Sequence, residues 1–144
     1  MTLLDSNVII YASNPRDDLH AWAKNLITDA ALQKRAAANA ITLAEVCAGA
    51  AYPLIVREQL LGWRVQIVDV PASAAEICAE AYRLYSKRRR EALPENPAPK
   101  TPLPDFFIGA HASVMGWDIA TADEGRFRTY FPEVTLHTPA DAPE

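Results

Sequence analysis

The sequence predicts an α/β fold in which helices cover both faces of a parallel sheet. Short apolar runs that resemble strands alternate along the chain with longer segments of helical periodicity, and this alternation is typical of such sheets. Four carboxylates, Asp5, Glu45, Asp105 and Asp123, each stand where an apolar run gives way to a turn or a helix start. Such junctions share one edge of an open α/β sheet, where ligands bind, so we expect the four acids to lie together.

The predicted strands are short, and the first of them is followed by a loop around residues 14–17. They lie near Leu4, at 37–39, at 65–70, near Ile119 and at 134–137. The strand at 65–70 is rich in β-branched residues, which favour strands.

The predicted helices are longer than the strands. They cover 20–33, 42–50, 53–62, 72–89 and 104–115, with a short helix near Phe127. Pro53 suits the first turn of its helix, because a proline there removes no intrahelical hydrogen bond. The proline-rich segment 94–102 cannot be helix interior, and we expect a mobile surface loop there, within a single domain of residues 1–144.

Composition excludes some classes of protein. No apolar run approaches the roughly 20 residues that a membrane span needs, and no signal peptide is visible at the N-terminus. Cys47 and Cys78 form no CxxC pair, so a reduced cytoplasm is the expected location. A net charge of −4 argues against a broad, non-specific nucleic-acid binder, but it leaves local, metal-centred phosphate contact open.

The four acids themselves indicate a chemistry. Gathered at one sheet edge, they would repel one another, and their pKa values would rise unless a cation offset the charge. Mg²⁺ or Mn²⁺ suits oxygen ligands and keeps water and phosphate in its coordination shell. We therefore predict a metal-dependent enzyme that acts on phosphate esters. Zinc is not expected, since His20, His111 and His137 lack the paired spacing of zinc ligands.

Four segments that contain these acids also carry a family resemblance: residues 3–11, 41–46, 103–112 and 120–123. In their order and spacing they resemble a PIN-domain ribonuclease, the VapC-like toxin of type II toxin–antitoxin modules, from about residue 2 to residue 139. The resemblance implies a three-layer α/β/α fold with a central parallel sheet of about five strands. It also implies cleavage of single-stranded RNA, a homodimer, and inhibition by a cognate antitoxin whose segment would lie in a groove of the helices at 20–62.

Asp5, Asp105 and Asp123 are the expected ligands of one or two Mg²⁺ or Mn²⁺ ions, with Glu45 assisting. Each has a structural alternative. Asp5 could cap the turn after its strand, Asp105 could serve the dipole in the first turn of its helix, and Asp123 could be an ordinary turn residue. Glu45, three residues after Thr42, fits a capping box and would then bond back to the Thr42 amide.

Other residues near the acids are expected to serve the same site. Asn7 would orient Asp5 through a hydrogen bond, or else form a simple Asx turn. The Thr121 hydroxyl would point toward the same cleft. Arg126 and Arg128 are candidates for phosphate contact because they border it.

Three features concern the RNA-binding surface, the shape of the cleft and the antitoxin groove, and the sequence alone does not decide their roles. The basic run 87–90 is more typical of a solvated helix end than of an RNA-binding surface. The segment 94–102 is longer than the family usually has there, and Phe106 and Phe107 are bulkier than the usual small pair. Trp22, Leu60 and Trp63 could serve an antitoxin groove, although core packing is the commoner fate of such residues.

Two other functions remain as alternatives. A haloacid-dehalogenase-like phosphatase would use Asp5 as a covalent nucleophile, but it wants a second acid where Asn7 stands and a lysine near the later acids, and none follows Lys100. The second alternative is a non-catalytic binding protein whose acids are only structural.

Overall fold

The computed structural model describes residues 1–142 of the chain. Its five-stranded sheet has the order β3-β2-β1-β4-β5, and every pair of neighbouring strands is parallel. The strands are β1 (Thr2–Leu4), β2 (Ala36–Asn39), β3 (Gln66–Val68), β4 (Asp118–Ala120) and β5 (Leu136–His137). The predicted parallel α/β sheet is confirmed.

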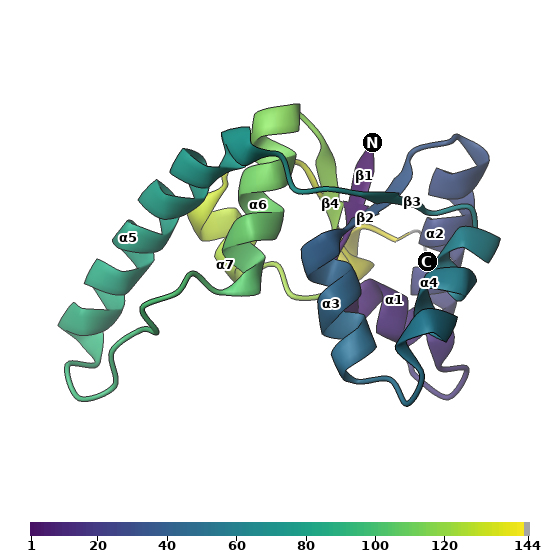
Figure 1. Cartoon of the computed structure of the whole chain (residues 1–144), viewed down its shortest axis with the longest axis horizontal. Helices are drawn as coiled ribbons and strands as arrows, with labels where there is room; N and C mark the ends of the chain where they lie inside the picture. Colours follow the sequence, from purple (N-terminus) through teal and green to yellow (C-terminus); the bar gives the residue numbers. More distant parts are fainter. Residues whose placement is uncertain (143–144) are drawn as a thin grey trace.

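The helices flank this sheet on both sides (Figure 1). They are α1 (Ser6–Ser13), α2 (His20–Leu32), α3 (Ala40–Ala48), α4 (Pro53–Gly62), α5 (Ala75–Ala92), α6 (Pro104–Met115) and α7 (Gly125–Tyr130), with short 3₁₀ turns at Ala72–Ala74 and Pro139–Asp141. The bounds of α4 and α6 are those predicted, and Pro53 and Pro104 stand in their first turns. The other predicted helices are present with ends shifted by a few residues.

Helix α1 was not predicted. It has only eight residues, and its β-branched Val8, Ile9 and Ile10 have modest helix propensity. One local and one tertiary effect stabilise this helix. Asp5 caps its N-terminus, and Val8, Ile9 and Ala12 bury one side of the helix in the core. The helix therefore depends on packing that its own sequence only partly indicates.

The two faces of the sheet support separate layers of core. Because side chains alternate along a strand, Leu4 faces one layer and Leu3 the other. The Leu4 layer packs mainly against α1, α2 and α4, and the Leu3 layer against α5, α6 and α7. This arrangement gives the three layers, helix, sheet and helix, visible in Figure 1.

The strand β3 is shorter than the predicted 65–70. Its partner β2 ends at Asn39, which pairs with Val68, and helix α3 begins at the next residue, Ala40. Beyond Val68 the chain has no strand beside it with which to continue the ladder, so the pairing stops there.

Aromatic side chains fill the layer between α5, α6 and α7. Phe106 is fully buried and its ring lies 5.1 Å from that of Tyr82 and 6.1 Å from that of Phe131. Gly109 allows α6 to pack closely against Phe131, since a Cβ at position 109 would lie 2.3 Å from the Phe131 ring. The bulk of Phe106 is therefore accommodated in the core and does not fill the acidic cleft.

The segment 94–102 is irregular and connects α5 with α6, as predicted. Two contacts hold it against α5. The Tyr82 hydroxyl donates to the Pro99 carbonyl, and Arg89 Nε donates to the Asn96 carbonyl at 2.9 Å. Within residues 1–142, no helix is both long and apolar enough to cross a membrane.

Candidate functional site

The order of the strands creates a crevice at one edge of the sheet. The chain passes from β1 outward to β2 and β3, then returns to the other side of β1 to form β4. At such a reversal the connections diverge, and ligands of doubly wound sheets bind beside the carboxyl ends of the two strands concerned. Asp5 directly follows β1 and Thr121 directly follows β4, so both lie at this crevice.

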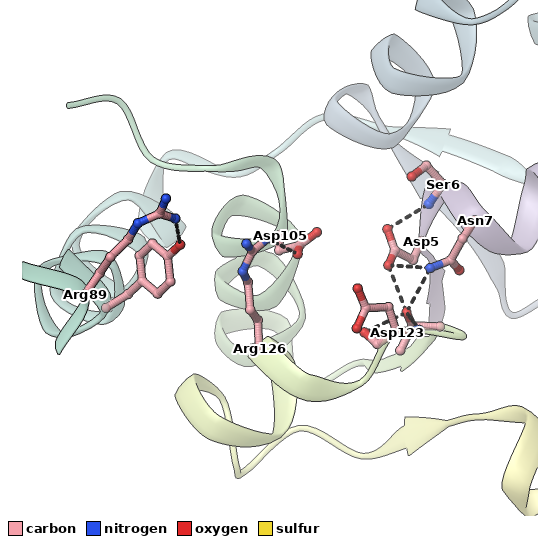
Figure 2. Close-up of polar contacts among 9 residues, drawn as sticks. Asp5, Ser6, Asn7, Arg89, Asp105, Asp123 and Arg126 are labelled. Carbon is pink, nitrogen blue, oxygen red and sulfur yellow. Dashed lines mark hydrogen bonds and ion pairs between the residues drawn. The ribbon is translucent and has the colours of Figure 1, made fainter. Parts of the chain in front are cut away.

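Asp5 is buried, with only 4% of its surface exposed, and both of its carboxylate oxygens accept hydrogen bonds. Oδ1 accepts from the Ser6 amide at 2.8 Å, which caps α1. Oδ2 accepts from the Thr121 hydroxyl at 2.9 Å and from Asn7 Nδ2 at 3.4 Å (Figure 2). The capping role expected as an alternative for Asp5 thus coexists with a second oxygen turned toward the crevice. The Ser6 amide is a partner that the sequence analysis missed, because α1 itself was missed.

Asn7 and Thr121 bind each other and the loop after β4. Asn7 Oδ1 accepts from the Ala122 amide at 3.2 Å, and Asn7 Nδ2 reaches the Thr121 hydroxyl oxygen at 3.4 Å. These bonds replace the Asx turn that was the alternative for Asn7. The fully buried Thr121 hydroxyl also accepts from the Asp123 amide at 3.0 Å, so one hydroxyl connects Asp5 with the backbone of Asp123.

The acids influence one another electrostatically. Burial raises the pKa of Asp5 to about 6, and the negative charges of Asp105 and Asp123 add to that rise, while the hydrogen bonds from Thr121 and Ser6 oppose it. A carboxylate with such a pKa is ionised at neutral pH only at an energetic cost. Asp123 itself is exposed at the mouth of the crevice.

The structure contradicts the capping box, which was the structural alternative for Glu45. Helix α3 begins at Ala40, and its cap is Asn39, whose Oδ1 accepts from the Thr42 amide at 3.0 Å. Thr42 already lies inside the helix, and its hydroxyl donates to the Leu4 carbonyl. Glu45 is consequently one turn too far along to close a box.

The carboxylate of Glu45 instead lies close enough to Asp5 and Asp105 to interact with them electrostatically. Burial raises its pKa, and the charges of Asp5 and Asp105 raise it further. Among the residues that the structure describes, its Oε1 is buried without a hydrogen-bond partner. A buried, unpartnered carboxylate oxygen is costly unless a ligand binds it.

Asp105 stands in the first turn of α6 and makes an ion pair with Arg126 of α7. Arg126 Nη1 lies 3.1 Å from Asp105 Oδ2, and the guanidinium also lies over the ring of Tyr85, 5.5 Å from its centre. Figure 2 shows Asp105 between this arginine and Asp5. The structure therefore places Arg126 at the border of the cleft, on a carboxylate. Arg128 pairs with Glu124 at 3.0 Å.

The acids are neighbours, yet they do not form a closed metal cage. In the positions shown, no three Asp, Glu, His or Cys side chains within residues 1–142 are close enough together to hold a metal ion. His111 lies elsewhere, against Asn39, and His137 pairs with Asp118. The unpartnered oxygen of Glu45 and the raised pKa of Asp5 both fit a site that a cation would complete.

The chain matches one known protein family over most of its length. The PIN domain family matches residues 2–131, most of the chain. The chain belongs to the PIN domain family. The resemblance seen in the sequence is thereby confirmed, and with it the three-layer α/β/α fold. Among curated protein sequences, none matches this chain at a significant level.

Solved structures similar to this PIN domain come from bacterial complexes. FitAcB from Neisseria gonorrhoeae is 25% identical over 99% of this chain and 100% of that chain, with a TM-score of 0.64. DNA-bound VapBC from Salmonella typhimurium is 20% identical over 96% of this chain and 98% of that one, with a TM-score of 0.65. A toxin–antitoxin complex from Klebsiella pneumoniae is 22% identical over 96% and 98%, with a TM-score of 0.62. The last two likenesses show the fold alone.

Proposed function

We propose that this PIN domain is a divalent-metal-dependent endoribonuclease that cleaves single-stranded RNA. The observation that carries the proposal is the charge at the crevice: Asp5 is buried with a pKa of about 6, and Glu45, Asp105 and Asp123 surround it. Such a concentration of carboxylates is suited to Mg²⁺ or Mn²⁺, which prefers oxygen ligands. The family and the toxin–antitoxin neighbours support a ribonuclease toxin.

Each residue of the crevice has a role in this proposal. Asp5, Asp105 and Asp123 would hold one or two ions, with Glu45 contributing its unpartnered oxygen. A bound divalent ion supplies a water of lowered pKa and stabilises negative charge on the phosphate. Asp105 would have to leave Arg126, and the guanidinium released at the cleft border would then be available to a phosphate oxygen.

Thr121 and Asn7 would act on Asp5, by fixing its orientation. A Thr121→Val variant is expected to cleave RNA about 10- to 100-fold more slowly, as is typical when a partner that orients a metal ligand is removed. Valine keeps the volume but loses the hydroxyl that donates to Asp5 Oδ2. Initial rates of cleavage would measure the effect, with Thr28→Val as control, because Thr28 makes its hydroxyl bond within α2. An unchanged rate would remove Thr121 from the site.

The proposed partner is an antitoxin, one segment of which would bind on the side of the molecule opposite α5. A groove of about 610 Å³ runs between α2 and α4, lined partly by Ile27, Leu32 and Trp63. Leu32 is exposed there, while Leu60 of α4 is fully buried and belongs to the core. The apolar face of an antitoxin helix would pack into this groove. The homodimer and the cytoplasmic location stay predictions from the sequence.

Cleavage of labelled single-stranded RNA tests the proposal. Purified protein is expected to cut with Mg²⁺ or Mn²⁺, to stop in EDTA, and to lose activity as Asp105→Asn. Cutting that survives both EDTA and the substitution would overturn the metal site. Hydrolysis of p-nitrophenyl phosphate through a covalent intermediate on Asp5 would instead establish the phosphatase alternative, although Asn7, in the place of its second acid, bonds to Asp5 and Ala122.

A further inference from the structure

A second charged feature lies outside the acidic crevice. A groove of about 710 Å³ runs between α5 and the segment 94–102. Arg83, Lys87, Arg90 and Lys100 line it, together with one acid, Glu80, which belongs to α5. This is a local excess of positive charge on a chain whose net charge is −4, so the groove is suited to an anion.

Three of the cations form a stripe along α5. Arg83, Lys87 and Arg90 are four and three residues apart, so they lie on the same side of the helix. All three are exposed. At 1.5 Å of rise per residue the stripe extends for about 10 Å, long enough to follow a short stretch of polyanion.

The basic run 87–90 is divided among different tasks. Arg89 is partly buried, donating to the Asn96 carbonyl and, from Nη1, to the Tyr85 hydroxyl at 2.8 Å. The Arg88 guanidinium lies 5.5 Å from the centre of the Tyr130 ring. Lys87 and Arg90 face the groove. The run therefore does more than end a helix, a division that its sequence does not reveal.

The opposite wall of the groove is held in place and leads to the acids. The bonds that Pro99 and Asn96 accept from α5 fix the segment 94–102 against the helix. That segment leads into α6 (Figure 1). The first turn of α6 carries Asp105. Lys100 precedes Asp105 by five residues, so their Cα atoms are at most about 18 Å apart.

We propose that this groove binds the phosphate backbone of the single-stranded RNA and delivers it to the crevice at Asp105. The inference rests on the proposed nuclease function and deepens it, since it names where the substrate is held away from the scissile bond. Grooves that bind single strands without sequence preference place Lys and Arg along the backbone. Each phosphate neutralised releases counterions, so binding here depends on salt.

Binding without cleavage tests the groove separately from the nuclease. Fluorescence anisotropy of a labelled single-stranded RNA is measured in EDTA, over a range of salt concentrations, with the variant Arg83→Gln/Lys87→Gln/Arg90→Gln. We expect a loss of at least about tenfold in affinity. The plot of log K against log salt has a negative slope, and its magnitude should decrease by about 2 in the variant. This corresponds to about 0.7 for each of three lost phosphate contacts on a single strand.

The matched control removes the same charge from the other side of the molecule. Arg16, Lys24 and Arg57 are exposed and belong to the α1–α2 connection, α2 and α4. Their combined change to Gln should leave both affinity and salt slope close to those of the wild type. An equal loss in the control would reduce the effect to net charge and overturn the groove. Circular dichroism and thermal unfolding check that both variants are folded.

The remaining outcomes separate the two proposals. Salt-dependent RNA binding that needs the stripe, in a protein that never cuts RNA, would support the groove and contradict the nuclease. Metal-dependent cutting with unchanged KM in the groove variant would contradict the groove and leave the nuclease standing. Stripe-dependent binding of a poly-glutamate peptide, without binding of RNA, would assign the surface to an acidic protein and overturn the proposal.

Discussion

An Asp5→Asn variant is expected to lose more than about 100-fold in RNA cleavage and, when free of metal, to be more stable than the wild type. The activity should fall further than for a residue that only orients a ligand, for which about 10- to 100-fold is usual. Asparagine can still cap α1, because its side-chain oxygen can accept from the Ser6 amide. The loss would therefore come from the missing charge and not from a missing helix.

The gain in stability follows from the environment of Asp5. Its carboxylate is buried and repelled by Asp105 and Asp123, so ionising it at pH 7 destabilises the folded state. A rise in pKa from 3.8 to about 6 corresponds to a cost of up to about 3 kcal/mol for ionising Asp5 in the folded state, a cost that the neutral amide does not have. The net gain for asparagine is smaller than this, because its amide nitrogen cannot accept the hydrogen bonds that Oδ2 accepts from Thr121 and Asn7. Urea unfolding in EDTA, beside cleavage of labelled RNA, measures both effects.

Asp69 offers a matched control for this experiment. It follows β3 as Asp5 follows β1, but it is exposed. Asp69→Asn should change neither stability nor cleavage appreciably. If Asp5→Asn were less stable than the wild type and kept its activity, Asp5 would be only a helix cap, and the acidic crevice would lose its central member.

The alternation of strands and helices could be predicted because each element carries its own periodicity. The five strands and six of the helices are present for that reason. Helix α1 depends instead on burial of Val8, Ile9 and Ala12 against other parts of the chain. Local pattern cannot show this, because β-branched residues also suit strands.

The candidate site shows the same division. Asp5 and Asp123 follow strands and Asp105 stands in the first turn of α6, so their positions in the sequence predicted a place at one sheet edge, whereas Glu45 lies in the second turn of α3. The role of Glu45 could not be decided locally, since both Asn39 and Thr42 can cap a helix. The Thr42 hydroxyl reaches the Leu4 carbonyl, a contact across 38 residues, and the helix therefore begins earlier. The pairing of Asp105 with Arg126 likewise depends on how α6 and α7 pack.

The stability of the metal-free protein should rise as the pH falls from 7 toward 5. The pKa of Asp5 is about 6 in the folded state and 3.8 in the unfolded chain. Between pH 3.8 and 6 the folded state therefore binds the proton more tightly than the unfolded chain does. Asp5's contribution to the free energy of unfolding is then greatest below pH 4 and declines, by up to about 3 kcal/mol, as the pH rises through 6. The raised pKa of Glu45 acts in the same direction.

A divalent ion should reverse this dependence, because it binds the ionised carboxylates of the folded state and competes with protons. Urea unfolding at pH 5, 6 and 7 is therefore expected to show stabilisation by Mn²⁺ that is largest at pH 7 and shrinks at pH 5. Asp5→Asn should show a flatter pH profile in EDTA and little response to Mn²⁺. If the profiles of wild type and variant ran parallel, with equal responses to the ion, the charge at the crevice would not be what a metal relieves, and the proposed site would have to be sought elsewhere.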